Sequence, residues 1–256
     1  MFINNFTRSL LALSLLTITS LVYADTTLVA VASDFTKPMT EIASAFEKAT
    51  GHSAKLSFGS SGKAFAQIQS DAPFEVYLSA SEKYPLELEK SGHAVPNSHF
   101  VYAIGKLVLW SATPGYVDNQ GEILQTGNFK HIALADPAHA PYGVVAEDVM
   151  KSLGVLDKLR PLFVMGENIS QTFQFVSTGN AELGFVAFAQ VIDINTGKIG
   201  SGSGWIIPDN LHGPFNQTAV LLKKGAENPA ALALVDFLKS PTALAIIEKY
   251  GFGLTK

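Results

Sequence analysis

Apolar residues follow two periods along the chain, and these periods alternate. Short runs of consecutive apolar residues, such as residues 28–32, are typical of buried β-strands, while the next segment has apolar residues at i, i+3, i+4 and i+7, as on one face of a helix. Strands are predicted at residues 28–32, 54–58, 75–79, 100–104, 107–111, 131–135, 183–188 and 218–223. Helices are predicted around residues 39–46, 65–68, 84–90, 146–153, 168–176, 231–238 and 243–250. This alternation predicts an α/β fold with largely parallel sheets.

Four junctions between a predicted strand and the following helix carry polar residues or glycines. They are residues 32–36, 58–63, 136–143 and 166–171. Sheets of this class bind ligands beyond the carboxyl ends of their strands, which is where such junctions lie. These four loops are therefore the first candidates for a binding site.

A helix that begins at such a loop presents backbone N–H groups without partners inside the helix, and its dipole favours negative charge. Such helix starts bind anions without cationic side chains. Ser33 and Ser61 would add hydroxyl donors, and Gly59 and Gly62 would allow a close approach of the backbone. Four facing helix starts could offer roughly six to eight donors. Serine and asparagine are also ordinary helix N-caps, so spacing alone leaves open whether the loops bind a ligand.

The N-terminal segment has the features of an export signal. Arg8 precedes an apolar run over residues 10–22, which ends in Val22-Tyr23-Ala24 before Asp25. A small residue at each end of such a triplet is typical of signal-peptide cleavage, and the run is shorter than the roughly 20 residues that span a bilayer. We therefore predict a signal peptide at residues 1–24 and a soluble mature protein. An uncleaved membrane anchor is the alternative.

Composition excludes several classes of function. The chain has 18 basic and 22 acidic residues, and cleavage after Ala24 would remove Arg8 and change the net charge from −4 to −5. A mildly acidic chain has no basic surface for nucleic acid. The chain has no cysteine, which excludes thiol nucleophiles and thiolate metal sites. The apolar fraction of 47% is sufficient for a core without disulfides.

Other candidate chemistry is weak in the sequence. The six histidines have no metal-ligand spacing, and we expect neither a metal site nor a cofactor. His139 lies near the third loop and could make binding pH-dependent, although a surface histidine is the simpler interpretation. Lys63 could balance an anion's charge or be a solvated helix lysine. Ser60 and Ser61 lack the full spacing of a hydrolase nucleophile motif, so we expect no enzyme activity.

Several segments together resemble the periplasmic molybdate-binding protein family, ModA, of ABC transporters. The matching segments are residues 31–39, 58–63, 72–80, 102–110, 133–138, 141–143, 167–169, 183–186 and 249–252. No single segment identifies the family, but the order and spacing of all the segments together do. The resemblance covers residues 27–252.

The resemblance implies a type II periplasmic binding protein, with two α/β lobes joined by a two-strand hinge. On that pattern lobe one comprises residues 25–104 plus 214–256, and lobe two comprises residues 105–213. The chain would begin in the first lobe, cross to the second and return.

The resemblance also places the family's anion ligands on five residues. They are Ser33, Asp34, Ser61, Tyr142 and Ile169. A tyrosine hydroxyl that another branch of the family uses is missing, because that position is Ala187. Asp34 departs from a branch that has asparagine there. A carboxylate beside a dianion is repulsive, so we expect its side chain to turn away and cap the following helix while its N–H faces the ligand.

The implied function is capture of molybdate or tungstate between the lobes and delivery to an ABC permease with its ATPase. The resemblance implies a periplasmic protein, and we expect a monomer. Phosphate, sulfate and small carboxylates remain open as other ligands. Phosphate can carry a proton and would need an acceptor, which Asp34 could supply.

Overall fold

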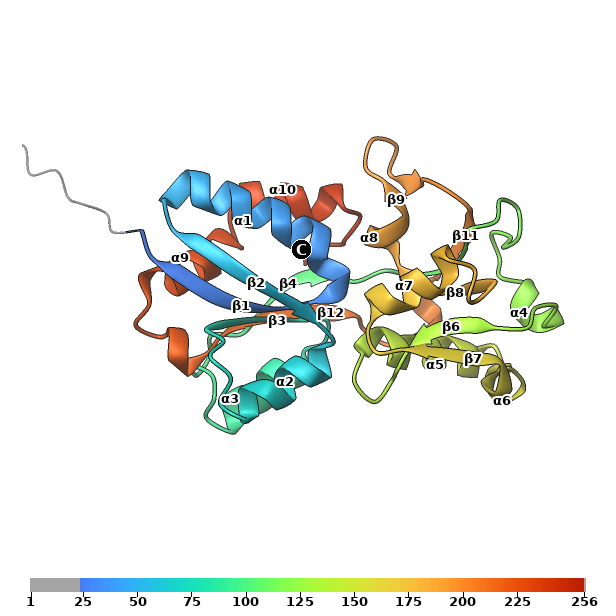
Figure 1. The fold of residues 1–256 in the computed structure, drawn as a ribbon, viewed down its shortest axis with the longest axis horizontal. Helices are drawn as coiled ribbons and strands as arrows, with labels where there is room; N and C mark the ends of the chain where they lie inside the picture. Colours follow the sequence, from blue (N-terminus) through green and yellow to red (C-terminus); the bar gives the residue numbers. More distant parts are fainter. Residues whose placement is uncertain (1–23, 256) are drawn as a thin grey trace, which may run out of the picture.

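The computed structural model describes residues 24–255, so most of the predicted signal peptide, residues 1–23, lies outside the described residues. Figure 1 shows two lobes side by side along the long axis, each built on one five-stranded sheet covered by helices. The first sheet has the order β2-β1-β3-β12-β4 and the second has the order β11-β5-β8-β6-β7. Within the described part of the chain no single helix is long and apolar enough to cross a membrane, and the one pair that passes on composition, α9 with α10, is bent by 61°.

The first sheet takes strands from two separate parts of the chain. Its strands are β1 (Thr26–Ala32), β2 (Ser53–Gly59), β3 (Val76–Ser79), β4 (Phe100–Ile104) and β12 (Asn216–Leu221). Its helices are α1 (Thr36–Thr50), α2 (Ser61–Gln69), α3 (Lys83–Lys90), α9 (Pro229–Phe237) and α10 (Pro241–Lys249). Helices α1, α9 and α10 pack on one face through residues such as Phe46 and Leu234, and α2 and α3 pack on the other through Ile68 and Leu88.

The second sheet is continuous in sequence. Its strands are β5 (Leu107–Ser111), β6 (Ile132–Ala135), β7 (Phe163–Gly166), β8 (Leu183–Ala187) and β11 (Ser203–Ile206). Its helices are α4 (Ile123–Thr126), α5 (Pro141–Ser152), α6 (Leu156–Leu159), α7 (Ile169–Ser177) and α8 (Phe188–Val191), and a short hairpin joins β9 (Ile192–Asp193) to β10 (Lys198–Ile199). Helix α5 buries Val149 on one face, and α7 buries Val176 on the other.

The predicted alternation of strands and helices is confirmed, with additions. Strands β7, β9, β10 and β11 and helices α4, α6 and α8 were not predicted, because each is only two to four residues long. The prediction of largely parallel sheets is only partly right, because both sheets are mixed. Strand β12 runs antiparallel to both neighbours, and β5 runs antiparallel to β8 and β11, so four of the eight strand pairs in the two sheets are antiparallel. These antiparallel strands are the ones next to the connections between the sheets.

Two connections join the sheets, from β4 to β5 and from β11 to β12. They lie beside each other, since the Gly105 N–H donates to the carbonyl of Phe215 at 2.9 Å. A Cβ at Gly105 would lie 3.0 Å from the Phe215 ring, so a glycine permits this close contact.

Each of the four predicted loops follows a strand and opens a helix. Strand β1 leads through the 3-10 turn η1 (Ser33–Phe35) into α1, β2 leads into α2, β6 into α5 and β7 into α7. The predicted start of α7 at Asn168 is confirmed, because its Oδ1 accepts from the N–H groups of Ser170 and Gln171. Gln171 does not complete a capping box, since its Oε1 accepts instead from the Glu167 N–H at 2.6 Å.

Candidate functional site

The four strand-to-helix loops meet at the boundary between the lobes. The Ser33 hydroxyl donates to Oδ1 of Asn168 at 3.3 Å, and the Ser170 hydroxyl donates to the Ser33 carbonyl at 3.1 Å. The Gly62 N–H donates to the carbonyl of His139 at 2.8 Å. Each bond joins a helix start of the first lobe to one of the second, so the four candidate loops form one site.

All five predicted ligand residues are buried at this boundary. They are Ser33, Asp34, Ser61, Tyr142 and Ile169. Ser61 and Ile169 are the first residues of α2 and α7, and Tyr142 is the second residue of α5. Their N–H groups therefore have no acceptor inside their own helices. The site combines shielding from water with helix starts, which is the combination that favours an anion.

Ser61 is held so that its hydroxyl hydrogen is available. Its Oγ accepts from the Ala80 N–H at 3.0 Å, and its carbonyl accepts from the Tyr77 hydroxyl at 2.7 Å. A hydroxyl that already accepts still has one hydrogen to donate. The neighbouring Ser60 is also buried, and its Oγ has no hydrogen-bond partner among residues 24–255. The sequence motif contained Ser60 but did not indicate that it was a candidate donor.

Asp34 departs from the expectation that its carboxylate caps the following helix. Neither η1 nor α1 has a side-chain cap hydrogen bond. Instead, Oδ2 of Asp34 accepts from the Tyr142 hydroxyl at 3.1 Å and from the side-chain amide of Gln217. Oδ1 of Asp34 is buried and has no hydrogen-bond partner within the described part of the chain. The prediction that Asp34 caps the helix was wrong, because two buried donors, one from each lobe, bind its carboxylate instead.

Burial raises the pKa of Asp34 from 3.8 to about 6, against the lowering effect of the hydrogen bonds from Gln217 and Tyr142. The backbone N–H groups of Asp34 and Phe35 also lower this pKa, but neither forms a hydrogen bond with Oδ1. Loss of water around the carboxylate outweighs these neutral donors. Asp34 therefore gains a proton under far milder conditions than an exposed aspartate.

The sequence missed two members of this buried network, Gln217 and Tyr102. The Tyr102 hydroxyl donates to Oε1 of Gln217 at 2.7 Å, which orients the Gln217 amide toward Asp34. Burial raises the pKa of both Tyr102 and Tyr142 well above its usual value, so both phenols stay neutral donors. Both Gln217 and Tyr102 lie inside strands, where no local pattern marks a functional residue.

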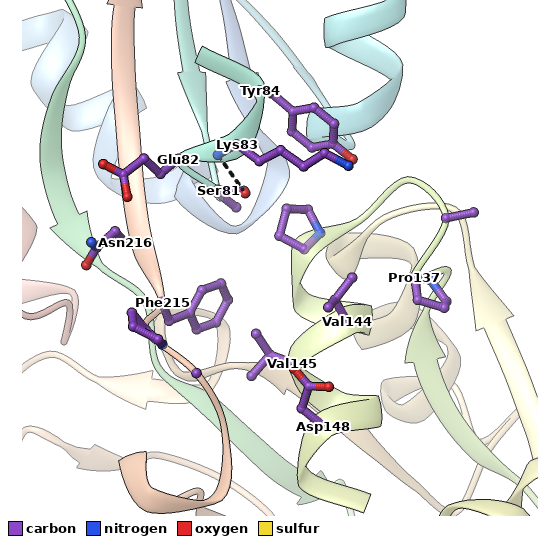
Figure 2. A pocket seen from close by; sticks show the side chains of 15 residues that line it. Ser81, Glu82, Lys83, Tyr84, Pro137, Val144, Val145, Asp148, Phe215 and Asn216 are labelled. Carbon is purple, nitrogen blue, oxygen red and sulfur yellow. Dashed lines mark hydrogen bonds between the residues drawn. The ribbon is translucent and has the colours of Figure 1, made fainter. Parts of the chain in front are cut away.

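A cavity of about 380 Å³ lies beside this site, between the lobes. Figure 2 shows Val145 and Phe215 on its apolar side, with Glu82, Lys83 and Asp148 around it. The Phe215 ring packs edge-on against Tyr142 at 4.5 Å between ring centroids. None of the described residues that line this cavity is one of the five predicted ligands. The four loops, rather than this cavity, are therefore the better candidate for a small anion.

The structure also places four further residues that the sequence analysis named: Lys63, Ala187, Gly62 and Gly59. Lys63 forms an ion pair with Glu167 across the boundary at 2.9 Å, and both side chains are about half exposed. Ala187 ends β8 and offers no side-chain donor. A Cβ at Gly62 would lie 2.8 Å from the His139 carbonyl, so this glycine permits contact between the lobes, whereas a Cβ at Gly59 would meet nothing within 4 Å.

The buried donors at the boundary are neutral, and Asp34 is the one acidic residue that is buried there among the described residues, since Lys63 and Glu167 are about half exposed. In the described residues no group of three or more His, Asp or Glu side chains could hold a metal ion.

Comparisons with known proteins agree with this geometry. A family model described as bacterial extracellular solute-binding protein matches residues 27–253. The chain is 54% identical over 226 residues to the molybdate-binding protein ModA of Azotobacter vinelandii, covering 88% of this chain and 89% of that protein. It is 52% identical over 223 residues to ModA of Rhodobacter capsulatus, covering 87% of this chain and 86% of that protein.

The solved structure of the periplasmic molybdate-binding protein from Azotobacter vinelandii superposes with a TM-score of 0.87 at 43% identity, and covers 90% of this chain and 100% of that chain. This match confirms the predicted α/β periplasmic binding protein fold. The chain belongs to the bacterial extracellular solute-binding proteins and, within them, to the family of ModA molybdate-binding proteins.

Proposed function

We propose that this chain captures molybdate or tungstate at the boundary between its lobes and delivers it to an ABC permease with its ATPase. The observation that carries the proposal is the meeting of four helix starts, after β1, β2, β6 and β7, at one buried boundary. Relatives that are 54% and 52% identical are molybdate-binding proteins, which supports the choice of ion.

The ligand's oxygen atoms accept hydrogen bonds from the five predicted residues. Ser61 donates its N–H and hydroxyl groups, and Asp34, Tyr142 and Ile169 donate N–H groups. Ser33 donates its N–H and, on binding, turns its hydroxyl from Oδ1 of Asn168 to the ligand. The N–H of Ile169 suits this role because Asn168 caps the next two N–H groups of α7 and leaves the first one. Neutral donors that are held in place within each lobe replace the ion's hydration shell when the two lobes close on it.

Capture requires the lobes to move, and the two adjacent connections between the sheets suit a two-strand hinge. We place lobe one at residues 25–104 plus 214–256 and lobe two at residues 105–213. The hydrogen bond from Gly105 to Phe215 keeps the two hinge strands together. The anion contacts both lobes, so it favours the closed arrangement by its differential affinity.

The setting that we propose is the periplasm, reached by cleavage of a signal peptide at residues 1–24. The protein acts as a monomeric binding protein and not as an enzyme, with no cofactor and no nucleic acid partner. The match to extracellular solute-binding proteins and to a periplasmic molybdate-binding protein supports the periplasmic setting, and the mild negative charge offers no basic surface for nucleic acid.

A second oxyanion, phosphate, is favoured by one specific observation. Oδ1 of Asp34 is a buried acceptor without a partner in the described residues. A protonated phosphate could donate to it, whereas fully ionised sulfate has no hydrogen to offer.

Calorimetric titration of the mature protein with molybdate, tungstate, sulfate and phosphate tests the proposal. We expect sub-micromolar Kd values for molybdate and tungstate, which correspond to more than about 8 kcal/mol. We expect at least a hundredfold weaker binding of sulfate. Binding of phosphate without binding of molybdate would contradict the choice of ion, and a permease complex that forms equally well without ligand would contradict delivery.

A further inference from the structure

The carboxyl group of Asp34 lies within the helix start that also offers the N–H groups of Ser33 and Asp34. Its partners from every packed element are neutral: the Tyr142 phenol from α5, the Gln217 amide from β12 and, through Gln217, the Tyr102 phenol from β4. No basic side chain among residues 24–255 forms an ion pair with Asp34. Nothing in this network therefore supplies a positive charge to balance an ionised Asp34.

Hydrogen-bond chemistry then limits what can occupy the site. An ionised carboxylate only accepts hydrogen bonds, and so do the oxygen atoms of a fully ionised tetrahedral oxyanion. Oδ2 of Asp34 already has two donors, while the buried Oδ1 has none in the described residues. A ligand oxygen beside Oδ1 makes a hydrogen bond only if a proton lies between the two oxygen atoms.

Electrostatic repulsion between an ionised Asp34 and the anion also favours a proton at this position. Two like charges in a water-excluded site repel strongly, and neutralising one of them is the ordinary response of a carboxyl group. Burial already brings the pKa of Asp34 to about 6 without a ligand, so an adjacent anion raises it further.

We propose that oxyanion capture by this chain takes up one proton, which is held between the Asp34 carboxyl and a ligand oxygen. This inference rests on the proposed function and deepens it. The reaction is the protein with ionised Asp34, plus a dianion, plus one proton, giving a complex in which the protonated carboxyl donates to the ligand. Asp34 thereby acts as a specificity-determining residue: it makes affinity depend on proton concentration and permits ligands that bring their own proton.

Proton uptake can be measured directly by calorimetry of molybdate binding at pH 8 in two buffers of different ionisation enthalpy, such as Tris and HEPES. The dependence of the observed heat on buffer enthalpy gives the number of protons taken up. We expect a value near one at pH 8 and a smaller value at pH 6, where part of the free protein already carries the proton. We also expect molybdate affinity to fall about tenfold per pH unit from pH 7 to pH 8.5.

The matched variants are Asp34→Asn and Asp236→Asn. The amide of the first donates without a proton from solution, so its molybdate affinity should be independent of pH and about tenfold or more tighter than that of the native protein at pH 8.5. Asp236 lies on α9 with its side chain 86% exposed, and its variant should keep the native pH dependence.

Zero proton uptake by the native protein at pH 8 would overturn the inference even if Asp34→Asn fails to fold. Equal pH dependence in the native protein and in Asp34→Asn would also overturn it, because the proton would then go elsewhere. Tight molybdate binding that does not change with pH would contradict this inference but would leave the proposed function intact. Absence of molybdate binding at every pH would reject both.

Discussion

The phenol of Tyr142 donates a hydrogen bond of 3.1 Å to Oδ2 of Asp34, and this bond joins the two lobes. Tyr142 belongs to the first turn of α5 in the second lobe, while Asp34 lies in the turn after β1 in the first. A loop proposed to bind the anion through its backbone is thus tied through its side chain to the opposite loop. In the proposed mechanism, binding and closure therefore involve the same two residues.

The Tyr142→Phe variant should destabilise the protein by about 1–3 kcal/mol, because a buried carboxylate loses one of its two donors. The same change should raise the pKa of Asp34 further, since the Tyr142 hydrogen bond lowers it. Denaturant unfolding at pH 7 measures the first effect. Tyr116→Phe is the control, because the exposed Tyr116 hydroxyl makes a hydrogen bond of 3.3 Å to the Asn128 carbonyl. Equal losses in the two variants would show that burial of the bond is irrelevant.

The raised pKa of Asp34 predicts a pH dependence of stability with a definite sign. In the unfolded chain this carboxyl ionises near 3.8, but in the folded protein it keeps its proton up to about pH 6. The folded state therefore binds more protons in this window, and the free energy of unfolding falls as the pH rises from about 4 to 6. A difference of about two pKa units corresponds to about 3 kcal/mol.

The ligand-free Asp34→Asn variant should lose this pH dependence. Relative to the native protein it should gain stability from pH 4 to pH 7, by up to about 3 kcal/mol. Chemical denaturation of both proteins at pH 4.5, 6 and 8 provides the comparison, with Asp236→Asn as the exposed control. A stability difference that stays constant over this range would mean that Asp34 ionises normally in the folded protein.

Replacement of Ser61 by alanine should weaken molybdate binding about 10- to 150-fold, the equivalent of about 1.5–3 kcal/mol for a hydrogen bond to a charged group. The same change also leaves the Ala80 N–H without its acceptor, so unfolding must be measured alongside calorimetry. Ser70→Ala, at the exposed C-terminal end of the same helix, should bind as the native protein does. Unchanged affinity in a folded Ser61→Ala protein would remove this hydroxyl from the site.

Gly143 tests whether the start of α5 must lie as close to β6 as it does. A Cβ there would lie 2.0 Å from the Ala135 carbonyl, which is backbone and cannot move aside freely. Gly143→Ala should displace the first turn of α5 with Tyr142, destabilise the protein by several kcal/mol and weaken binding at least tenfold. Gly213→Ala is a fair control, because its Cβ would meet nothing within 4 Å. Thermal unfolding and calorimetry together check both effects.

Much of the architecture could be predicted because strands and helices alternate with different periods. The four loops could be found because polar residues and glycines directly follow short apolar runs. The two edge strands of the second sheet, β7 and β11, were not predicted because each has only four residues, whereas the longer edge strands of the first sheet, β2 and β4, were predicted. The antiparallel direction of β12 was not predicted either, because strand direction depends on the connections between strands, which leave no local pattern in the sequence.

The site was predicted at its helix starts but not in its interior. Ser33 and Ser61 are hydroxyl residues at strand ends, and residues of that kind can be read from a sequence. Gln217 and Tyr102 sit within buried strands, and only the paired sheet brings their side chains to Asp34. The orientation of the Asp34 carboxylate followed from these distant partners, so a local capping rule gave the wrong answer.

The place of β12 between β3 and β4 has a consequence for biogenesis. A chain that is translocated from its N-terminal end delivers every strand of the second sheet, residues 107–206, before it delivers residues 216–221. The second lobe can thus complete its sheet first. Until β12 arrives, the edges of β3 and β4 that pair with it stay unpaired. Unpaired strand edges are sites of aggregation. In the proposed export, chaperone dependence should therefore concentrate on the first lobe, and mutations that slow the pairing of β12 should reduce yield more than equally destabilising mutations in the second lobe.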